Sequence, residues 1–571
     1  MSTLLAAAVH SGRFTTLDWG VVVIYVLTIA AVGLWLSRGQ QSKRDYFLGG
    51  RNIPWWAVGF SIVATETSAL TVIGVPGMAI GALAVKEGLI SASKGSMLFM
   101  MVVLGHIIGR IIIAVYIVPY YFKGDVYTPY QLLSRAFGQK ARFVASGLAL
   151  ITTALGAGVR VYASAIPIMF AMRGFYEGWG INHSIALIML IAMVYTSLGG
   201  IKAVVWTEIL QYFIFVGGGL FALYYIPTLL EGNLAAPSGA THWAAVKEVA
   251  ADNMTIFKTG FLSSAELHAK LGETYTFGQA FWAQIQNIFC GDYNLIMGLL
   301  AVPPGIVLAI GFNQLSVQRV LCCRNTSDGR KSMIMSACLI APQFLMFLLI
   351  GICLFAFYKI NGFQFFGFEP WDPNSIGKPK ADYVFPSFIM TQMPEILKGF
   401  MVAAILSAAM SSESGALSAM SSMVVMDFYK PLQKRAEDER TELKLSRITT
   451  LFCGLVLAIV AYLSQASSKV FDLAFTFVGL TSGGILGAFV IGMIRKRGFA
   501  GPIIAGMVCS FLFMVLLNLV MSTWSAKINW PWHIPIGMLV ALLVIRLALI
   551  GLPDSKDGGI AVVEGETPTK T

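Results

Sequence analysis

Six ionisable side chains lie inside long apolar stretches of this 571-residue sequence, and they are the first candidates for chemistry. A charge at the centre of a membrane costs about 2.5–3.5 kcal/mol on insertion scales, so each such residue is a candidate for function. We assign a structural role to Arg110 and Arg546, which can extend to the membrane surface or lie in a packed interior. The stronger candidates lie among small hydroxyl residues, and they are Glu66, Arg160, Glu208 and Glu413.

Two runs of small hydroxyl residues surround these charges. One is Ala64–Ala69 (ATETSA) and the other is Ser407–Gly415 (SAAMSSESG). Serines three residues apart, such as Ser411 and Ser414, share a helix face, and such a face supplies oxygen ligands for sodium without a full charge. The alternative is that small residues only let helices approach closely, and the pattern leaves both interpretations open.

The sequence has thirteen apolar runs that are long enough to span a bilayer, and the six ionisable residues lie within them. Charged residues make up 12% of the chain, against about 25% in soluble domains, and a spanning helix needs about 20 apolar residues. The first 20 residues lack the pattern of a cleaved signal peptide, so we expect the first run to remain in the protein. The runs lie near 18–37, 55–83, 95–121, 143–172, 183–199, 204–230, 296–318, 332–357, 397–426, 446–465, 471–494, 499–523 and 532–553.

Basic residues alternate between the connecting loops. Six alternate loops hold 22 of the 40 Lys and Arg residues. Because basic loops stay on the cytoplasmic side, we expect a multi-pass protein of the cell membrane (inner or plasma membrane) with its N-terminus outside and its C-terminus in the cytoplasm. The basic loops are 38–54, 122–142, 200–203, 319–331, 427–447 and 495–498.

Other classes of function find no support in the motifs. The net charge of +11 is spread over loops and forms no single basic face, so we expect no nucleic-acid partner. Seven scattered cysteines and six isolated histidines suggest neither a disulfide framework nor a zinc site. The sequence has no Walker motif that could drive a pump with ATP, and we do not expect an enzyme.

Glycine and proline interrupt two of the apolar runs. We expect the first interruption at Ile73–Gly77 (IGVPG), and the second at Pro303–Gly305 (PPG) and Gly311. A pair of interrupted helices at the start of two halves indicates an inverted-repeat transporter with its binding site at the midplane. Between the halves, the amphipathic segment Phe277–Cys290 is predicted to be a helix, either over the transport path or at the membrane interface.

The motifs of this sequence resemble those of the sodium/solute symporter family, which includes sodium–galactose, sodium–proline, sialic-acid and iodide carriers. The resemblance covers roughly residues 20–525, and its motifs occur in the family's order. They are Asp45–Arg51 (DYFLGGR), Pro54–Gly59 (PWWAVG), Gly199–Glu208 (GGIKAVVWTE), Gly311–Gln314 (GFNQ) with Gln318 and Arg319, Ala408–Ser412 (AAMSS) and Met426–Lys430 (MDFYK).

The resemblance implies an all-α polytopic membrane protein with a LeuT-like core of two inverted five-helix repeats and about 13 transmembrane helices. The expected order is an extra helix and cytoplasmic loop (1–54), a first repeat (55–230), an external loop (231–295), a second repeat (296–494), C-terminal helices (495–553) and a cytoplasmic tail (554–571). We expect a monomer in the lipid bilayer.

The resemblance also implies a sodium site between the first and eighth core helices. Its ligands are the backbone carbonyls of Ala64, Thr67 and Ala408 and the hydroxyls of Ser411 and Ser412. A second sodium, found in some members, implies Glu208, Ser411 and Ser414 here. Gly415 replaces a serine of that pattern and Glu208 replaces the usual, shorter Asp, so this second site stays open.

The family's sugar pocket does not carry over, because the aromatic that stacks on galactose is replaced near Ala309 and the family's asparagine becomes Glu66. Arg160 lies about one helical turn from the position where the sialic-acid carrier holds a carboxylate, and an Arg fork donates two parallel hydrogen bonds to such a group. The alternative is that Arg160 pairs with Glu66 and neutralises both charges. The candidate solute residues are Glu66, Thr71, Arg160 and Gln314.

We therefore predict a sodium-coupled symporter that imports a small organic solute, such as a sugar, a sugar acid or another carboxylate, by alternating access. One rival is a proton-coupled carrier of the same fold, with Glu66 or Glu413 as the titrating group. A second rival, a sensor built on a transporter fold, is disfavoured because about 18 residues follow the last apolar run and leave no room for a kinase.

Overall fold

The structure is a computed structural model, and it describes most of the chain. The described residues are 14–37, 49–81, 83–86, 89–92, 95–122, 129–173, 176, 178–196, 201–230, 242–361, 383–429, 431, 439–465, 470–495, 498–522 and 528–550. The predicted tail 554–571 lies outside them.

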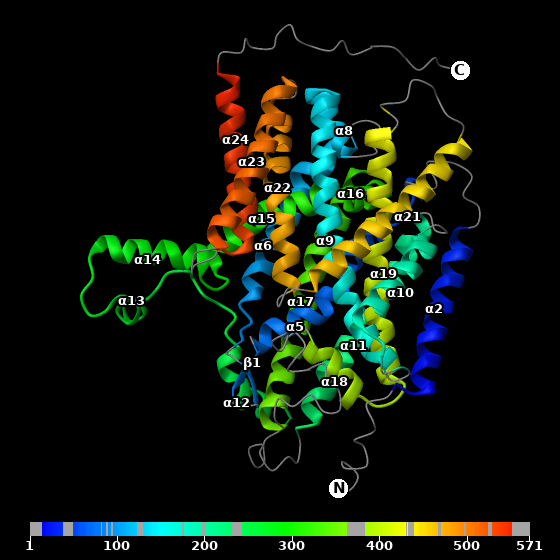
Figure 1. Ribbon diagram of the computed structural model, residues 1–571, viewed down its shortest axis with the longest axis vertical. Helices are drawn as coiled ribbons and strands as arrows, with labels where there is room; N and C mark the ends of the chain where they lie inside the picture. The colour runs from blue at the N-terminus through cyan, green and yellow to red at the C-terminus, as the bar shows by residue number, and fades with distance from the viewer. Residues whose placement is uncertain are drawn as a thin grey trace.

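Helices form nearly all of the described structure (Figure 1). The first half contains α2 (Thr16–Ser37), the 3₁₀ turn η1 (Gly49–Arg51), α4 (Trp55–Glu66), α5 (Ala69–Ile80), α6 (Phe99–Ile112), the π turn η2 (Ile113–Ile117), α7 (Val118–Tyr121), α8 (Tyr130–Phe137), α9 (Gln139–Arg173), α10 (Ile181–Thr196) and α11 (Ile201–Thr228). Strands β1 (Leu83–Lys86) and β2 (Leu89–Ala92) pair antiparallel, with Leu83 opposite Ala92.

The second half follows after a connecting segment. It contains α12 (His242–Ala250), the 3₁₀ turn η3 (Ala251–Asn253), α13 (Ser264–Leu271), α14 (Phe277–Cys290), the π turn η4 (Met297–Ala301), α15 (Val302–Ile306), the π turn η5 (Val307–Gly311), α16 (Gln314–Leu321), α17 (Thr326–Asn361), α18 (Val384–Gln392), α19 (Leu397–Met423), the π turn η7 (Val424–Tyr429), α21 (Glu439–Ser464), α22 (Val470–Arg495), α23 (Ala500–Ser522), the 3₁₀ turn η8 (Trp530–Trp532) and α24 (His533–Leu549).

Within the described ranges, seven helices are long and apolar enough to cross a membrane, or up to nine if each of two bent pairs is one span. This confirms the polytopic, helical class, while the predicted number of thirteen stays a prediction. Shorter apolar helices lie where the other predicted runs fall, at Thr16–Ile29, Ile181–Met193, Ile448–Ser464 and Val478–Ile494.

The first bent pair is α4 and α5, whose axes differ by 60°. The break is at Thr67, which is extended (φ −79°, ψ 92°), and the N–H of Ser68 donates to the Glu66 carbonyl at 3.1 Å, which leaves the Ala64 carbonyl without that helical partner. The predicted break at Ile73–Gly77 is wrong, because Pro76 lies inside α5. The Pro76 carbonyl packs closely on Gly351 of α17, and such packing retains proline within membrane helices.

The second bent pair joins Met297–Gly311 to Gln314–Leu321 at an angle of 62°. Asn313 begins α16, and its side-chain oxygen accepts a hydrogen bond from the N–H of Leu315 at 2.9 Å. The break therefore follows Gly311 directly, as predicted, but Pro303–Gly305 lies within helix. Pro303 stands in the first turn of α15 after a π turn, where proline's missing N–H is tolerated.

The helices around the two breaks pack in two groups. In the first, α17 packs against α4, α5 and α6; in the second, α9 packs against α10, α19, α21 and α22. Helix α11 connects the groups, since it contacts α4, α17 and α19. The contact sites use small residues, such as Gly158 of α9, on which Val460 packs without room for a Cβ atom.

Candidate functional site

A cavity of about 240 Å³ lies where the two broken helices face α9. Its walls combine apolar side chains with hydroxyl and amide groups, as binding sites for small molecules do. Polar or charged members are Thr65, Glu66, Ser68, Thr71, His106, Thr152, Thr153, Arg160, Asn313, Ser316 and Ser482. Ala309 also lines it.

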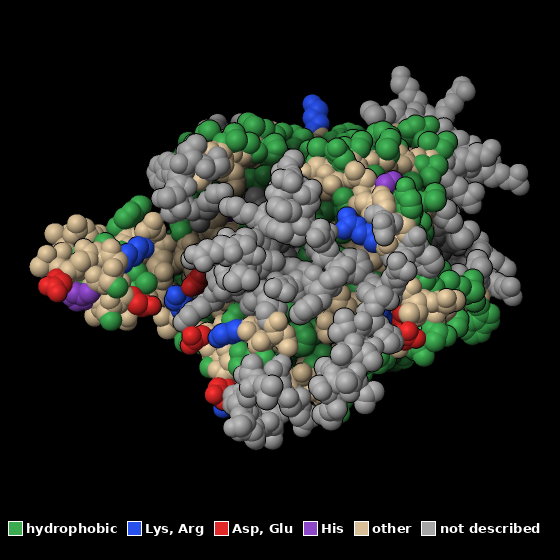
Figure 2. All heavy atoms as spheres, turned by 60° about the horizontal axis from the view of Figure 1, so that its bottom comes forward, with side chains coloured by type: hydrophobic (Ala, Val, Ile, Leu, Met, Phe, Trp, Pro, Cys, Tyr) green, Lys and Arg blue, Asp and Glu red, His purple; other side chains and the backbone are tan. Residues whose placement is uncertain are grey.

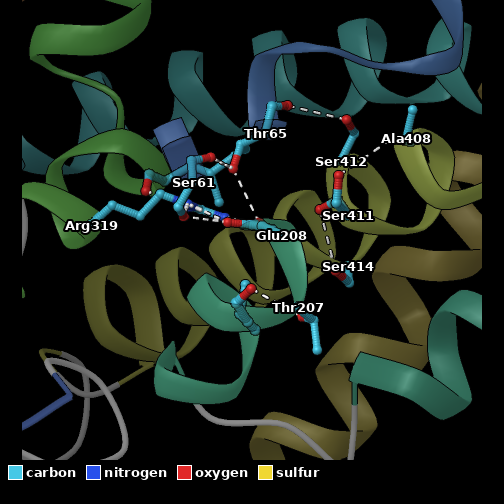
Figure 3. Close-up of polar contacts among 11 residues, drawn as sticks. Ser61, Thr65, Thr207, Glu208, Arg319, Ala408, Ser411, Ser412 and Ser414 are labelled. Atoms are coloured by element: carbon cyan, nitrogen blue, oxygen red, sulfur yellow. Dashed lines mark hydrogen bonds and ion pairs between the residues drawn. The ribbon is translucent and has the colours of Figure 1, made fainter. Parts of the chain in front are cut away.

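The residues predicted to bind sodium lie beside this cavity, where α19 crosses α4. Ser412 Oγ donates to the Thr65 carbonyl at 3.1 Å, so the two segments are in direct contact (Figure 3). Ser411 Oγ lies 3.4 Å from the Ala408 carbonyl. The Thr67 hydroxyl turns back to the Val63 carbonyl at 2.8 Å. The predicted ligands are thus brought together from two helices, and sodium binding by them stays a prediction.

Glu208 of α11 is the centre of a buried polar cluster next to that crossing. Arg319 of α16 donates to both carboxylate oxygens, from Nε at 3.1 Å and from Nη2. Thr65 Oγ1 donates at 3.0 Å, and Ser61 Oγ donates as well. Glu208 and Arg319 are each only 1% exposed, so this is an ion pair in the interior of the protein, and Figure 3 shows the carboxylate pointing toward Ser61 and Arg319.

This geometry bears on the predicted second sodium site. The hydroxyl of Ser414 donates to the Ser411 carbonyl at 3.3 Å, and the Glu208 carboxylate is turned to its four donors. A sodium ion that uses Glu208 competes with the charge of Arg319. The sequence prediction had counted Arg319 in the basic loop 319–331, and that placement is wrong, because Arg319 lies within the buried half of the second broken helix.

Glu66 forms its ion pair with Arg110 of α6 and not with Arg160, so the predicted alternative pairing is wrong. Arg110 is fully buried, and its Nη1 also lies 3.2 Å from Nδ1 of His106. The pairing was hidden in the sequence because Arg110 is 44 residues away from Glu66. Glu66 therefore lines the cavity with its charge already neutralised by Arg110. The ion pair gives Arg110 the structural role that we expected.

Arg160 lines the cavity from the middle of α9, and it is the one Arg or Lys among the described residues of the wall. Its Nε donates to the Gly156 carbonyl at 3.2 Å, one turn back. Its electrostatic partner is Glu413 of α19, which is 1% exposed. A guanidinium group thus stands at the cavity with a buried carboxylate near it.

Of the two remaining residues predicted to bind the solute, one lines the cavity and the other does not. Thr71 lines the cavity, whereas Gln314 is buried outside the cavity wall and its neighbour Asn313 lines it. The sequence analysis missed the polar wall residues His106, Thr152, Thr153, Asn313, Ser316 and Ser482. An asparagine directly before a helical segment is a capping signal, so Asn313 could have been found from the sequence.

Comparison with known proteins identifies relatives over nearly the whole chain. The family model described as the sodium:solute symporter family matches residues 46–509. The sodium/sialic acid symporter SiaT of Proteus mirabilis is 24% identical over 93% of this chain and 94% of its own length. The sodium/glucose cotransporter of Vibrio parahaemolyticus is 26% identical over 88% of this chain and 85% of its own.

The fold has a close counterpart among solved structures. A substrate-bound, outward-open Na⁺-coupled sialic acid symporter superimposes with a TM-score of 0.71, at 21% identity, over 94% of this chain and 98% of the other. At that identity the likeness concerns the fold, and the arrangement of helices around the cavity belongs to it.

Proposed function

The chain belongs to the sodium:solute symporter family and is a sodium-coupled symporter, and we propose that it imports a small, hydroxylated organic acid by alternating access. The observation that carries this proposal is Arg160, which brings a cation to the cavity wall. Thr152, Thr153 and Ser482 line the same cavity, and their hydroxyl oxygens can accept hydrogen bonds from the hydroxyl groups of a sugar acid. A relative named for sialic acid transport is in keeping with this class of solute.

A binding screen tests the solute class. Sugar acids, simple monocarboxylates and neutral sugars are added to the purified protein with and without sodium, and the melting temperature is measured, because a ligand stabilises by RT ln(1 + [L]/Kd). We expect sodium-dependent stabilisation by acids and not by neutral sugars. Stabilisation by neutral sugars alone would refute the proposal.

Arg160→Gln then tests the residue. Removing one partner of a buried charge contact costs about 2–5 kcal/mol of binding, so acids should lose at least tenfold in affinity. Arg546→Gln is the control, because Arg546 is exposed on α24 and should bind as the parent does. If Arg160 serves only to neutralise Glu413, Arg160→Gln and Glu413→Gln will each lower the melting temperature and the double variant will restore it.

We propose that one sodium ion binds at the crossing of α4 and α19, through the carbonyls of Ala64, Thr67 and Ala408 and the hydroxyls of Ser411 and Ser412. The support is the Ser412–Thr65 contact and the freed Ala64 carbonyl at the break.

Ser411→Ala and Ser412→Ala should each raise the sodium concentration for half-maximal uptake. Ser418→Ala is the matched control, because Ser418 is on the same helix but exposed. Equal sodium dependence in all variants would remove the site. The second site, with Glu208, Ser411 and Ser414, is tested by the number of sodium ions per solute, and one ion per solute in the parent would remove it.

The proposed architecture has thirteen spans, with inverted repeats at 55–230 and 296–494, the N-terminus outside and the C-terminus inside, in a monomer of the cell membrane. The support is that the two bent helices begin at Trp55 and Met297, near the proposed starts of the two repeats, because paired interrupted helices are typical of inverted-repeat transporters. Labelling of single cysteines from each side tests the orientation, and light scattering of the purified protein tests the monomer.

A proton-coupled carrier is the second candidate, and Glu413 is the observation that favours it. Among the described residues, neither oxygen of its carboxylate accepts a hydrogen bond of ordinary geometry. The hydroxyl of Ser164, which lies nearby, donates to the Arg160 carbonyl instead. A buried carboxylate of this kind can exchange a proton. Uptake driven by a pH gradient in sodium-free vesicles would establish this candidate, and its absence removes it.

A further inference from the structure

Helices α13 and α14 form a projecting arm at residues 257–292. In Figure 1 the arm extends sideways from the bundle, across the direction of α23 and α24 and level with the start of α24. Figure 2, turned toward the end where the N-terminus lies, shows the arm standing clear of the body. Helix α14 matches the predicted segment Phe277–Cys290, and it points away from the helices that surround the cavity.

The polar side of α14 is used inside the arm. Gln284 accepts from the Leu262 N–H at 2.6 Å and donates to the Leu262 carbonyl at 2.8 Å. Asn287 donates to the Gly260 carbonyl at 2.8 Å, and Lys270 of α13 donates to Gln286 at 3.1 Å. The helix therefore turns its amide side chains toward its own protein.

Three large aromatic side chains of α14 are exposed. Phe277 is 87% exposed, Phe281 57% and Trp282 66%, and the rings of Phe277 and Phe281 stack with their centres 6.3 Å apart. At about 100° per residue these side chains span an arc of about 140°, and Gln284 and Gln286 lie at its two edges. A helix in water shows the reverse arrangement, with apolar groups packed inward and amides outward.

The arm joins the bundle through further aromatic residues. Phe289 packs on Trp532 with ring centres 4.4 Å apart, and Trp530 Nε1 donates to Tyr293 at 3.0 Å. Trp530 begins the candidate span Trp530–Leu549. Tryptophan and tyrosine at the end of a span mark the membrane–water interface, so the aromatic face of α14 continues from that level.

We propose that α14 lies in the membrane interface beside α24 and that its partner is the phospholipid headgroup and upper acyl region. Amphipathic helices bind there through an aromatic face parallel to the membrane plane. Residues 257–292 carry Lys258 and Lys270 against Glu266, Glu273 and Asp292. Without a basic cluster, the attachment is apolar and independent of anionic lipid.

Spin-label accessibility in phosphatidylcholine vesicles tests this, with full-length protein in which Cys290, Cys338 and Cys509 are changed to Ser. A label is placed in Trp282→Cys, and the control is Ala269→Cys on the exposed side of α13. We expect the ratio of oxygen to nickel-chelate accessibility to be several-fold higher at 282 than at 269, and unchanged when phosphatidylglycerol is added. Equal ratios at both sites would place α14 in water and overturn the proposal.

Contact with a second copy of the chain would instead give spin–spin broadening at 282 that disappears on dilution with unlabelled protein, and this also overturns the proposal. If the cysteine variants do not fold, the parent and Trp282→Phe are compared in brominated phosphatidylcholine. Loss of a quenched component of the tryptophan emission in the variant supports the proposal. The same quenching in both proteins contradicts it.

Discussion

Glu208→Gln should destabilise the protein before any sodium or solute is added. Both charges of the Glu208–Arg319 pair are buried, at 1% exposure each. The substitution removes the negative charge and places an amide N–H₂ against guanidinium donors. Breaking such a pair costs about 3–5 kcal/mol because one charge is left buried alone. At about 1.4 kcal/mol per tenfold change, this is a hundred-fold or larger increase in the unfolding constant.

Glu208→Gln, Arg319→Met and the double variant are compared by thermal unfolding in detergent, without sodium. Each single variant should melt well below the parent, and the double variant should recover much of the loss, since a neutral pair can replace a buried ion pair at little cost. Arg546→Met is the control for loss of an arginine at an exposed position, and its melting should stay near that of the parent.

The reasoning is refuted if Glu208→Gln melts like the parent in the absence of sodium but is no longer stabilised by sodium. That outcome would make Glu208 an ion ligand whose charge Arg319 does not need. A double variant that is less stable than either single variant would also contradict the ion-pair assignment, because the two losses would then be independent.

Three other changes test the packing and charge pairs. Glu66→Gln should lower the melting temperature, because it leaves the buried Arg110 unpaired, and a parent-like melt would contradict that pairing. Asp427→Asn should be destabilising by about 3–5 kcal/mol for the same reason, as its carboxylate pairs with a buried arginine of α9. Gly158→Ala should cost about 1–3 kcal/mol by overpacking, whereas Gly501→Ala, with nothing within 4 Å, should not; equal melting of the two glycine variants would contradict the close contact.

The helical class could be predicted from the sequence because it depends on local pattern, whereas sodium binding by the two hydroxyl runs stays a prediction. Apolar runs identify spans whatever their partners, and the hydroxyl runs at 64–69 and 407–415 meet through Ser412 and Thr65. The breaks were harder. The first helix break was predicted near Pro76, whereas the helix is broken at Thr67, which lies within the hydroxyl run 64–69.

The charge pairs could not be predicted, for a different reason. Glu208 meets Arg319 across 111 residues, and Arg142 meets Asp427 across 285. Each of these side chains is compatible with several partners in the sequence, and only the packing of the helices decides between them. The assignment of Arg319 to a loop is an example, since a basic residue near the end of an apolar run has the same local pattern in a loop and in a buried helix.

The polar cluster around Glu208 also limits how the cavity can open. Its carboxylate joins α4, through Ser61 and Thr65, to α16, through Arg319. Helix α4 precedes the break of the first pair, and α16 follows the break of the second. A displacement of α16 alone would separate the buried charges of Glu208 and Arg319, and a displacement of α4 alone would remove two hydroxyl donors from Glu208. Both losses are avoided when the two segments move together with α11, which carries Glu208. Because Glu208 also belongs to the proposed second sodium site, an ion that binds there would act on both segments at once.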